Sequence, residues 1–473
     1  MTAPAAPIRS ADDLRGRRTV VLGLARSGVA ASRFLADAGA IVVAYDRRSP
    51  SDLADAVAAL GARPVHLALG VDPVEAAALV EHADLLVTSP SVSARFPTTD
   101  AWLREALTAA ETRGADVVSE IGLFLRLTRA RILGVTGTKG KTTSASLVAA
   151  MLARADLPHV LGGNIGTPLV ERATELQPTD WAVVELSELQ LPTIERGPEL
   201  ALYTNIGEDH LDRHGSAAAY RAVKARLAEL TAPAGRVILN HDDPGCRELG
   251  ERLPPASAAW YGLAEPGRGP AEAWVGADGW LVAAGDRLLP ASEVPLPGRH
   301  MLANVLGAAL AARLVGAAAP AIAAAVRDFP GVPHRLELVA ERDGVRYVND
   351  SQATIPVAAI AALEAFDGPV ILIAGGQGKG LDYATFADAI ARRCRSVVLM
   401  GETAPELERL IGRRVPVERV SGMAEAVATA SGRAEAGDVV LLAPAATSFD
   451  MFTDYAARGD AFREAVAAVG GAS

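Results

Sequence analysis

The chain has 473 residues, carries a formal net charge of −10 at pH 7, and is 50% hydrophobic but only 4% aromatic. The length predicts about three domains, and the composition is typical of an α/β protein. The acidic balance argues against nonspecific binding to nucleic acids or anionic membranes. Because no signal-peptide core and no long apolar run occurs, we expect a cytoplasmic protein without membrane insertion, and Cys246 and Cys394 are expected to be free thiols.

The predicted first domain, residues 1–130, begins with a strand, a glycine turn and a helix. The apolar strand covers residues 19–22, and a second strand at 41–45 ends at Asp46. A glycine in the first turn and an acidic residue after the second strand are typical of a nucleotide-binding half. Ala25 stands at the middle glycine of the dinucleotide fingerprint, so a pyrophosphate approaches less closely than in an NAD site. A Rossmann-like module without a ligand stays an alternative.

The predicted second domain, residues 131–297, opens on a strand, a glycine loop and an alanine-rich helix. This order brings backbone N–H groups and a helix N-terminus to one point, where a polyphosphate binds well. Lys141 adds a point charge for the β and γ phosphates, and the Thr142 hydroxyl is placed to ligate Mg²⁺. Val135 stands at the first glycine of the strict phosphate-loop pattern, which leaves a chance strand-turn-helix connection as the alternative. The predicted ATP-binding loop comprises Gly137, Thr138, Lys139, Gly140, Lys141, Thr142 and Thr143.

Two later strands of this domain lead to candidate metal ligands. Glu185 ends the strand 181–185, and the strand 202–206 leads to His210. Because the carboxyl ends of parallel strands meet at one sheet edge, we expect both side chains near the phosphate loop as Mg²⁺ ligands. In isolation, such a glutamate is a solvated or capping residue and such a histidine is structural. Lys224 lies on a predicted helix, and taken alone it belongs to a solvated face.

The predicted third domain, residues 298–473, alternates apolar strands with helices, which indicates a second doubly wound sheet. Three polar loops follow its strands, at residues 349–354, 375–379 and 443–450. Each loop alone is a weak signal, because any α/β domain has polar loops there. The predicted fold is therefore α/β with a Rossmann-like N-terminal domain, a P-loop central ATPase domain and a Rossmann-like C-terminal domain.

Ten motifs occur in one order along the whole chain: T-G-T-K-G-K-T, G-N-I-G, V-E-L-S-x-x-Q-L, N-I-x-E-D-H-L-D-R, Y-R-A-V-K, G-R-H-x-x-x-N, P-H-R-L-E, N-D-S-x-A-T, G-G-x-x-K-G and A-P-A-x-x-S-x-D-x-F. Together they resemble the Mur ligase family, and within it the ligases that add glutamate to UDP-N-acetylmuramoyl-L-alanine. The resemblance implies that ATP phosphorylates the acceptor carboxylate and that the glutamate amine attacks the acyl phosphate. This chemistry needs charge neutralisation more than a nucleophilic side chain. ATP and Mg²⁺ are the implied cofactors, and we expect a monomer.

The resemblance also assigns roles to residues. Lys141 and Thr142 would hold phosphates and Mg²⁺, and Glu185 and His210 would ligate metal. Lys224 corresponds to a family lysine that is carbamylated, which turns a cation into a carboxylate-like metal ligand. The further ATP-binding residues are Asn304 at the adenine, Arg335 and Asp350. The substrate-binding residues are Asp46, Asn164, Ser187, Gln190, Thr354, Lys379, Ser448 and Tyr455.

Several positions depart from the family pattern. Lys139 replaces an asparagine, and Glu188-Leu189 replaces a serine-phenylalanine pair. Gln352 stands where ligases for D-glutamate commonly have lysine, and Tyr455 stands where phenylalanine is expected. A lost cation removes a charge-assisted partner of one glutamate carboxylate. We therefore expect L-glutamate to be preferred, with D-glutamate and the same mechanism as the alternative.

Two other function classes stay open. An NAD-binding oxidoreductase explains the first strand-helix-strand unit but leaves the phosphate loop, Glu185 and His210 without a role. A P-loop switch or binding module of the GTPase type requires a guanine-reading N-K-x-D loop, which the sequence lacks.

Overall fold

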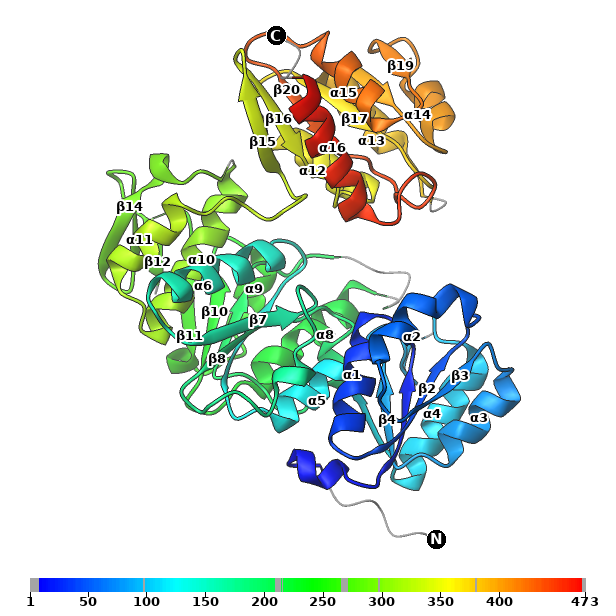
Figure 1. The fold of residues 1–473 in the computed structure, drawn as a ribbon. Helices are drawn as coiled ribbons and strands as arrows, with labels where there is room; N and C mark the ends of the chain where they lie inside the picture. The colour runs from blue at the N-terminus through cyan, green and yellow to red at the C-terminus, as the bar shows by residue number, and fades with distance from the viewer. Residues whose placement is uncertain are drawn as a thin grey trace. The chain divides into compact units, whose positions relative to one another are not determined.

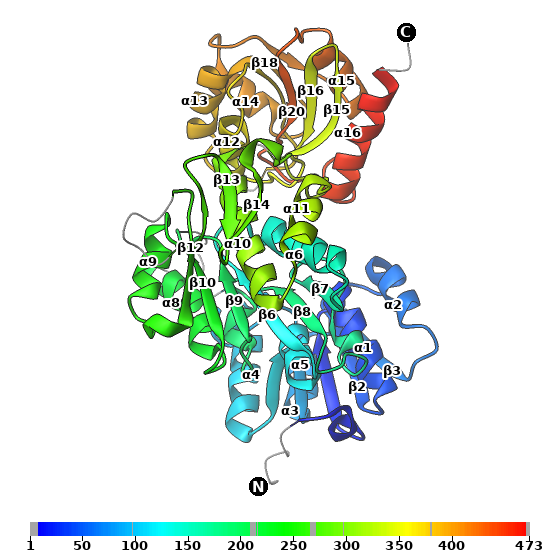
Figure 2. The same cartoon turned by 90° about the vertical axis from the view of Figure 1, so that its left-hand side faces the viewer.

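The computed structural model of the chain describes residues 8–96, 98–208, 214, 216–264, 271–296, 298–378 and 381–469 (Figures 1 and 2). It separates into two compact units. Unit 1 comprises residues 1–294 and 300–328, and unit 2 comprises residues 295–299 and 329–473. Unit 1 contains two sheets and unit 2 contains one, and most strand pairs are parallel. The α/β prediction is confirmed, while the division into three domains at residues 130 and 297 stays a prediction.

The first sheet of unit 1 has five parallel strands in the order β3-β2-β1-β4-β5 (Figure 1). The strands are β1 (Arg18–Leu22), β2 (Ile41–Asp46), β3 (Val65–Leu69), β4 (Leu85–Thr88) and β5 (Asp116–Ser119). The helices are α1 (Arg26–Asp37), α2 (Ala54–Leu60), α3 (Pro73–Glu81), α4 (Ala101–Arg113) and α5 (Glu120–Leu127). The strand order reverses between β1 and β4, so the crevice beyond their carboxyl ends is the natural ligand position.

The second sheet of unit 1 has nine strands in the order β14-β13-β12-β11-β10-β9-β6-β8-β7. The strands are β6 (Arg131–Thr136), β7 (His159–Gly163), β8 (Trp181–Glu185), β9 (Leu200–Tyr203), β10 (Arg236–Asn240), β11 (Ala258–Tyr261), β12 (Ala271–Val275), β13 (Trp280–Ala283) and β14 (Asp286–Pro290). β6 lies between β8 and β9 and is parallel to both. The loops after these three strands therefore leave the sheet at the same edge.

Helices surround this second sheet. They are α6 (Lys141–Arg154), α8 (Ala217–Leu230), α9 (Pro244–Gly250), α10 (Arg299–Val315) and α11 (Ala319–Arg327). Figure 2 shows α10 and α11 beside α6, and the contacts of α11 with α6 and β14 agree with this view. Nearly all of α10 and all of α11 thus belong to unit 1, although the sequence analysis assigned them to the third domain.

The two sheets of unit 1 share one apolar core. Residues of α1 and α5 and residues that follow β7 and β8 belong to the same buried cluster. At the start of α5, the buried Glu120 accepts a hydrogen bond from the Val170 N–H at 2.9 Å, which ties the first sheet to the second.

Unit 2 has a six-stranded sheet in the order β15-β16-β20-β17-β18-β19, with β15 antiparallel to β16 and the other pairs parallel. The strands are β15 (Glu337–Arg342), β16 (Val345–Asn349), β17 (Val370–Ala374), β18 (Cys394–Leu399), β19 (Val417–Arg419) and β20 (Val439–Leu442). α12 (Pro356–Glu364), α13 (Ala384–Arg393) and α14 (Ala404–Ile411) bury one face. α15 (Met423–Ser431) and α16 (Tyr455–Val469) bury the other.

The predicted strand at 181–185 matches β8, and the alternation of apolar strands and helices predicted for residues 298–473 is found in unit 2, for example in β17 and β20. The predicted strand at 202–206 was wrong at both ends, because β9 covers Leu200–Tyr203 and the next residues bind the phosphate loop. The antiparallel extension β12–β14 was not predicted. In the described part of the chain, no helix has the length and hydropathy that a membrane crossing requires.

Candidate active site

The phosphate loop joins β6 to α6 and has the backbone geometry that glycine permits. Gly137 has φ +153° and Gly140 has φ +84°. A Cβ at Gly137 would lie 1.9 Å from Thr204 Oγ1, and one at Gly140 would lie 2.6 Å from Asn304 Oδ1. Backbone strain therefore disfavours other residues at both positions, and the Thr204 and Asn304 side chains would also have to move. The loop ends at the N-terminus of the 14-residue helix α6, which favours an anion.

A second segment, Thr204–Asn205, holds this loop in place. The Asn205 carbonyl accepts from Thr138 N–H at 2.9 Å. The Asn205 side chain makes two hydrogen bonds with the Lys139 backbone. Its Oδ1 accepts from the Lys139 N–H at 2.9 Å, and its Nδ2 donates to the Lys139 carbonyl at 3.0 Å. Thr204 Oγ1 also donates to that carbonyl at 2.5 Å. Sequence reasoning missed the contacts of Thr204 and Asn205 with the loop, because these two residues were predicted to continue the strand that forms β9.

Two lysines converge on one carbonyl oxygen of the loop. Lys141 Nζ donates to the carbonyls of Gly137 and Thr138, both at 3.0 Å. Lys224 Nζ, from α8, donates to the same Gly137 carbonyl at 3.0 Å and to Thr136 Oγ1 at 3.3 Å. Lys224 is fully buried, so it does not belong to a solvated face. The loop therefore carries concentrated positive charge, as an ATP site requires.

Glu188 lies on the other side of Lys224. Its Oε2 is 4.0 Å from Lys224 Nζ, and the residue is only 6% exposed. The Tyr220 ring lies 5.5 Å from the same Nζ, and its hydroxyl donates to Thr138 Oγ1 at 3.2 Å. From the sequence, Glu188 was evident only as a departure from the family pattern. The sequence feature that could have identified Glu188 is its position as a second carboxylate, three residues after Glu185.

Glu185 ends β8 with one carboxylate oxygen bonded and the other not. Asn164 Nδ2 donates to Oε1 at 2.9 Å, and the Asn164 N–H donates to the Glu185 carbonyl at 2.9 Å. Glu185 Oε2 is buried, and it has no hydrogen-bond partner among the described residues. A buried carboxylate oxygen in this state is suited to a cation. His210, the predicted companion ligand, lies outside the described residues, as does Lys379.

The other predicted residues near the loop are Thr142, Thr143 and Asn304. Thr142 is half-buried in the first turn of α6. Thr143 is buried, and its hydroxyl has no partner among the described residues. The Asn304 amide lies directly against Gly140, so α10 brings the predicted adenine-binding residue to the phosphate loop.

Ser187 and Gln190 bind each other in the loop after β8. The Ser187 N–H and hydroxyl both donate to Gln190 Oε1, at 3.0 and 3.1 Å. The Gln190 carbonyl accepts from Thr193 Oγ1 at 2.7 Å, and Thr193 Oγ1 lies 2.6 Å from Ser119 Oγ. This predicted substrate-binding loop is thereby tied to the end of β5 in the first sheet.

Asp46 lies at the carboxyl end of β2, where its carboxylate accepts from the Leu24 N–H at 2.8 Å and pairs with Arg48 at 2.8 Å. Burial alone would raise the pKa of Asp46, but the hydrogen bonds from the Arg48 side chain and backbone and from Leu24 outweigh it and lower this pKa to about 2. Asp46 thus stays ionised and fixes the turn after β1 that a nucleotide would approach.

In unit 2, the three predicted polar loops meet at one edge of the sheet. The Ala445 N–H donates to Ala353 at 2.8 Å, and the Gln377 N–H donates to Thr447 at 2.9 Å. The buried Arg458 of α16 joins these loops. Its guanidinium donates to Ser351 Oγ and the Ser351 carbonyl at 3.0 and 2.9 Å, and to the carbonyls of Ala446 and Thr447 at 3.1 and 3.0 Å. No sequence motif pointed to Arg458.

Asp350 and Arg335 lie together at this edge. Burial raises the pKa of Asp350 to about 6, although the charge of Arg335 and a hydrogen bond from the Leu336 N–H act in the opposite direction. Of the predicted glutamate-binding residues, Ser448 is buried and Thr354 is half-buried. Tyr455 is 42% exposed, and its ring stands edge-to-face to His334 with centroids 6.2 Å apart.

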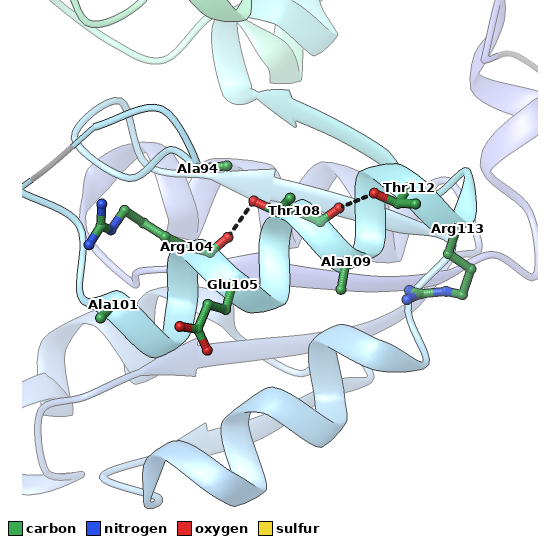
Figure 3. A pocket seen from close by; sticks show the side chains of 8 residues that line it. All are labelled: Ala94, Ala101, Arg104, Glu105, Thr108, Ala109, Thr112 and Arg113. Carbon is green, nitrogen blue, oxygen red and sulfur yellow. Dashed lines mark hydrogen bonds between the residues drawn. The ribbon is translucent and has the colours of Figure 1, made fainter.

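A groove along α4, on the first sheet of unit 1, is unrelated to these residues (Figure 3). Its lining residues are Ala94, Ala101, Arg104, Glu105, Thr108, Ala109, Thr112 and Arg113. Thr108 and Thr112 donate to carbonyls one helical turn back, both at 2.8 Å, so their hydroxyls are satisfied within the helix. No predicted site residue lines this groove.

Comparisons with known proteins agree on one family. Residues 135–312 match the family model described as the Mur ligase middle domain, and residues 334–446 match the model described as the Mur ligase glutamate ligase domain. The UDP-N-acetylmuramoylalanine–D-glutamate ligase of Nitrosococcus oceani is 40% identical over 459 residues, which cover 95% of this chain and 96% of that protein. The ligase of the same name from Symbiobacterium thermophilum is 37% identical over 458 residues, covering 96% and 98%.

A solved structure shows the same fold. The UDP-N-acetylmuramate–alanine ligase of Thermotoga maritima matches with a TM-score of 0.61 at 16% identity, covering 96% of this chain and 100% of that one.

Proposed function

The chain belongs to the Mur ligase family, and from this premise we propose that it is the ATP-dependent ligase that joins D-glutamate to UDP-N-acetylmuramoyl-L-alanine during peptidoglycan precursor synthesis. The observation that carries the proposal is the convergence of Lys141, Lys224 and Asn304 on one phosphate loop. Family membership removes the oxidoreductase and the GTPase-like module as competing functions.

The reaction proceeds in two steps that this site supports. In the first, the alanine carboxylate of the acceptor attacks the γ-phosphorus of ATP, an O–P bond forms, and the bond to ADP breaks. Lys141 and the N–H groups at the start of α6 neutralise the charge on the phosphates. In the second, the glutamate amine attacks the acyl carbon, a tetrahedral intermediate forms, phosphate leaves, and the amine gives up a proton.

The residues beside the loop fit the Mg²⁺ that the resemblance implies. The buried Glu185 Oε2, without a partner among the described residues, is an oxygen ligand of the kind that Mg²⁺ prefers. Glu185 and the Thr142 hydroxyl are the proposed ligands, and His210 stays a predicted one. When bound there, Mg²⁺ neutralises charge on the phosphates during transfer.

The isomer of glutamate is the finer part of the proposal. The relatives named above are ligases for D-glutamate, and their names support D-glutamate better than the L-glutamate preference expected from Gln352 and Tyr455. Tyr455 keeps an aromatic ring at a half-exposed position, so its hydroxyl does not require a rearranged pocket. L-glutamate is the second candidate, because Gln352 lacks the cation expected there.

For localisation and partners, we propose a cytoplasmic monomer that binds no nucleic acid and does not insert into membranes. The net charge of −10 supports the statement on nucleic acids.

The test combines the purified chain, ATP, Mg²⁺, the acceptor and either isomer of glutamate at equal concentration. Phosphate release and the mass of the amide product are measured. We expect turnover only with all substrates present and a preference of roughly a hundredfold or more for D-glutamate, since the wrong isomer leaves a buried carboxylate unpaired. A preference for L-glutamate would reverse the isomer assignment, and no amide with either isomer would overturn the ligase proposal.

A further inference from the structure

Met301 and Asn304 lie on one face of the first two turns of α10. Their side chains are three positions apart, a spacing at which helix side chains meet. Asn304 Nδ2 donates to Met301 Sδ at 3.7 Å, and both residues are buried. The contact therefore joins two side chains that the surrounding packing already confines.

The sulfur of Met301 decides which end of the Asn304 amide faces which neighbour. A thioether sulfur accepts hydrogen bonds and donates none, so only the NH₂ end of the amide fits beside it. The carbonyl end faces the phosphate loop, where Oδ1 lies 2.6 Å from the position that a Cβ of Gly140 would occupy. No hydrogen bond to Oδ1 occurs in the described part of the chain, which leaves this acceptor to a bound ligand.

An amide with this orientation tells two purines apart at position 6. Adenine carries an NH₂ donor there beside the N7 acceptor, whereas guanine carries an acceptor oxygen. Asn304 Oδ1 can accept from the adenine NH₂, while the second N–H of Nδ2 donates to N7. An oxygen at position 6 would face Oδ1 instead, and turning the amide over to relieve this repulsion would place Oδ1 against the sulfur.

We propose that Met301 is a positioning residue for nucleotide selection: its sulfur holds the Asn304 amide in the orientation that favours adenine over purines with an oxygen at position 6. The inference rests on the proposed function for the assignment of Asn304 to the adenine. What it adds is the residue that sets the direction in which Asn304 reads the base.

The first test measures the binding of ADP and of inosine diphosphate, each with Mg²⁺, by isothermal titration calorimetry. Inosine diphosphate carries an oxygen at position 6, as guanine nucleotides do. We expect the wild type to prefer ADP and Met301→Leu, which keeps the volume and removes the acceptor, to lower this preference about fivefold. Met151→Leu is the matched control, because Met151 is a fully buried methionine in the far half of α6. An unchanged preference in a folded Met301→Leu protein would overturn the proposal.

The second test asks whether Met301 acts through Asn304. The amide is absent from Asn304→Ala, so adding Met301→Leu to it should leave the ratio of the two affinities where Asn304→Ala alone puts it. A further shift of this ratio in the double variant would show that Met301 acts on the base by another route, and it would overturn the positioning role.

Neither test requires ligation. A wild-type protein that prefers ADP but forms no amide would contradict the proposed function and leave the inference standing. A wild-type protein that ligates glutamate but binds both nucleotides equally would do the reverse.

Discussion

The phosphate loop of unit 1 and the strand-end loops of unit 2 both lie at the carboxyl edges of largely parallel sheets, yet they are held differently. The phosphate loop has two glycines with positive φ, and the neighbouring Thr204–Asn205 segment binds its backbone at several points. The loops of unit 2 bond to one another through their backbones, and the buried Arg458 side chain bonds to two of them. The loop proposed to bind phosphate is thus held by a neighbouring backbone segment, and the loops proposed to bind glutamate depend in addition on one buried charged side chain.

Because the two sets of loops are held differently, mutations should affect phosphate transfer and glutamate binding separately. A change in unit 2 should disturb the selection of glutamate more than the handling of phosphate, and a change at the phosphate loop should do the opposite.

The largest effect is expected from Lys141→Ala. Removing a preorganised charge at the transferring phosphate should lower the ligation rate by about a thousandfold. Thermal unfolding should change little, because the half-buried Lys141 bonds through its ammonium to two backbone carbonyls rather than packing in an apolar core. Arg154→Ala, at the exposed far end of α6, is the control. Near-wild-type turnover of Lys141→Ala would show that the phosphate loop has been misassigned.

Arg458→Met should be the most damaging change in unit 2. Burial lowers the pKa of Arg458 to about 10 while Asp450 acts against this shift, so a buried charge and four hydrogen bonds are lost together. Carbonyls left without donors should lower the free energy of unfolding by about 3 to 4 kcal/mol. The KM for glutamate should rise more than the KM for ATP. Chemical denaturation and steady-state kinetics measure both, and equal rises in the two KM values would erase the contrast between the regions.

Asp350→Asn tests the same region through pH. Because burial raises the folded-state pKa of Asp350 to about 6 from 3.8, this group contributes stability below pH 3.8 that is lost as the pH rises through 6. A shift of about two units corresponds to about 3 kcal/mol. Asp350→Asn should therefore be more stable than the wild type by about 2 to 3 kcal/mol at pH 8 and by little at pH 4, with reduced ligation.

Urea unfolding at both pH values checks this expectation. Asp388→Asn is the control, since that carboxylate is 59% exposed. A stability difference that stays constant between pH 4 and pH 8 would contradict the role given to burial.

The smallest effect is expected from Asn205→Ala. It removes two hydrogen bonds to the Lys139 peptide, each contributing about 1 kcal/mol, so the KM for ATP should rise by up to about thirtyfold. Asn205→Asp keeps the acceptor and loses the donor, and it should give an intermediate value. A rise in the KM for glutamate alone would place Asn205 in the wrong half of the site.

Much of the fold was predictable because its signals are local. The strands β8, β17 and β20 are largely apolar runs, and loops that contain polar residues, glycine or proline follow them. The glycines of the loop between β6 and α6 adopt positive φ. The end of β9 was not predictable, because Thr204 and Asn205 leave the strand only to bind a loop 66 positions earlier.

The residues that sequence reasoning missed act through distant partners. Arg458 bonds to a residue 107 positions away, and nothing in the sequence around either residue signals the pair. Glu188 was evident as a departure from the family pattern. Its ion pair with Lys224 was not, because it depends on the burial of Lys224, which the pattern of α8 alone did not reveal.

The proposed mechanism requires the acceptor carboxylate to become an acyl phosphate before the glutamate amine attacks. UDP-N-acetylmuramoyl-L-alanine carrying ¹⁸O in both oxygens of the alanine carboxylate is incubated with the chain, ATP, Mg²⁺ and D-glutamate, and the products are analysed by mass spectrometry. We predict one ¹⁸O atom in each released phosphate and one in the new amide, because the oxygen that attacks phosphorus leaves with it. Amide product accompanied by phosphate without ¹⁸O would contradict the acyl phosphate.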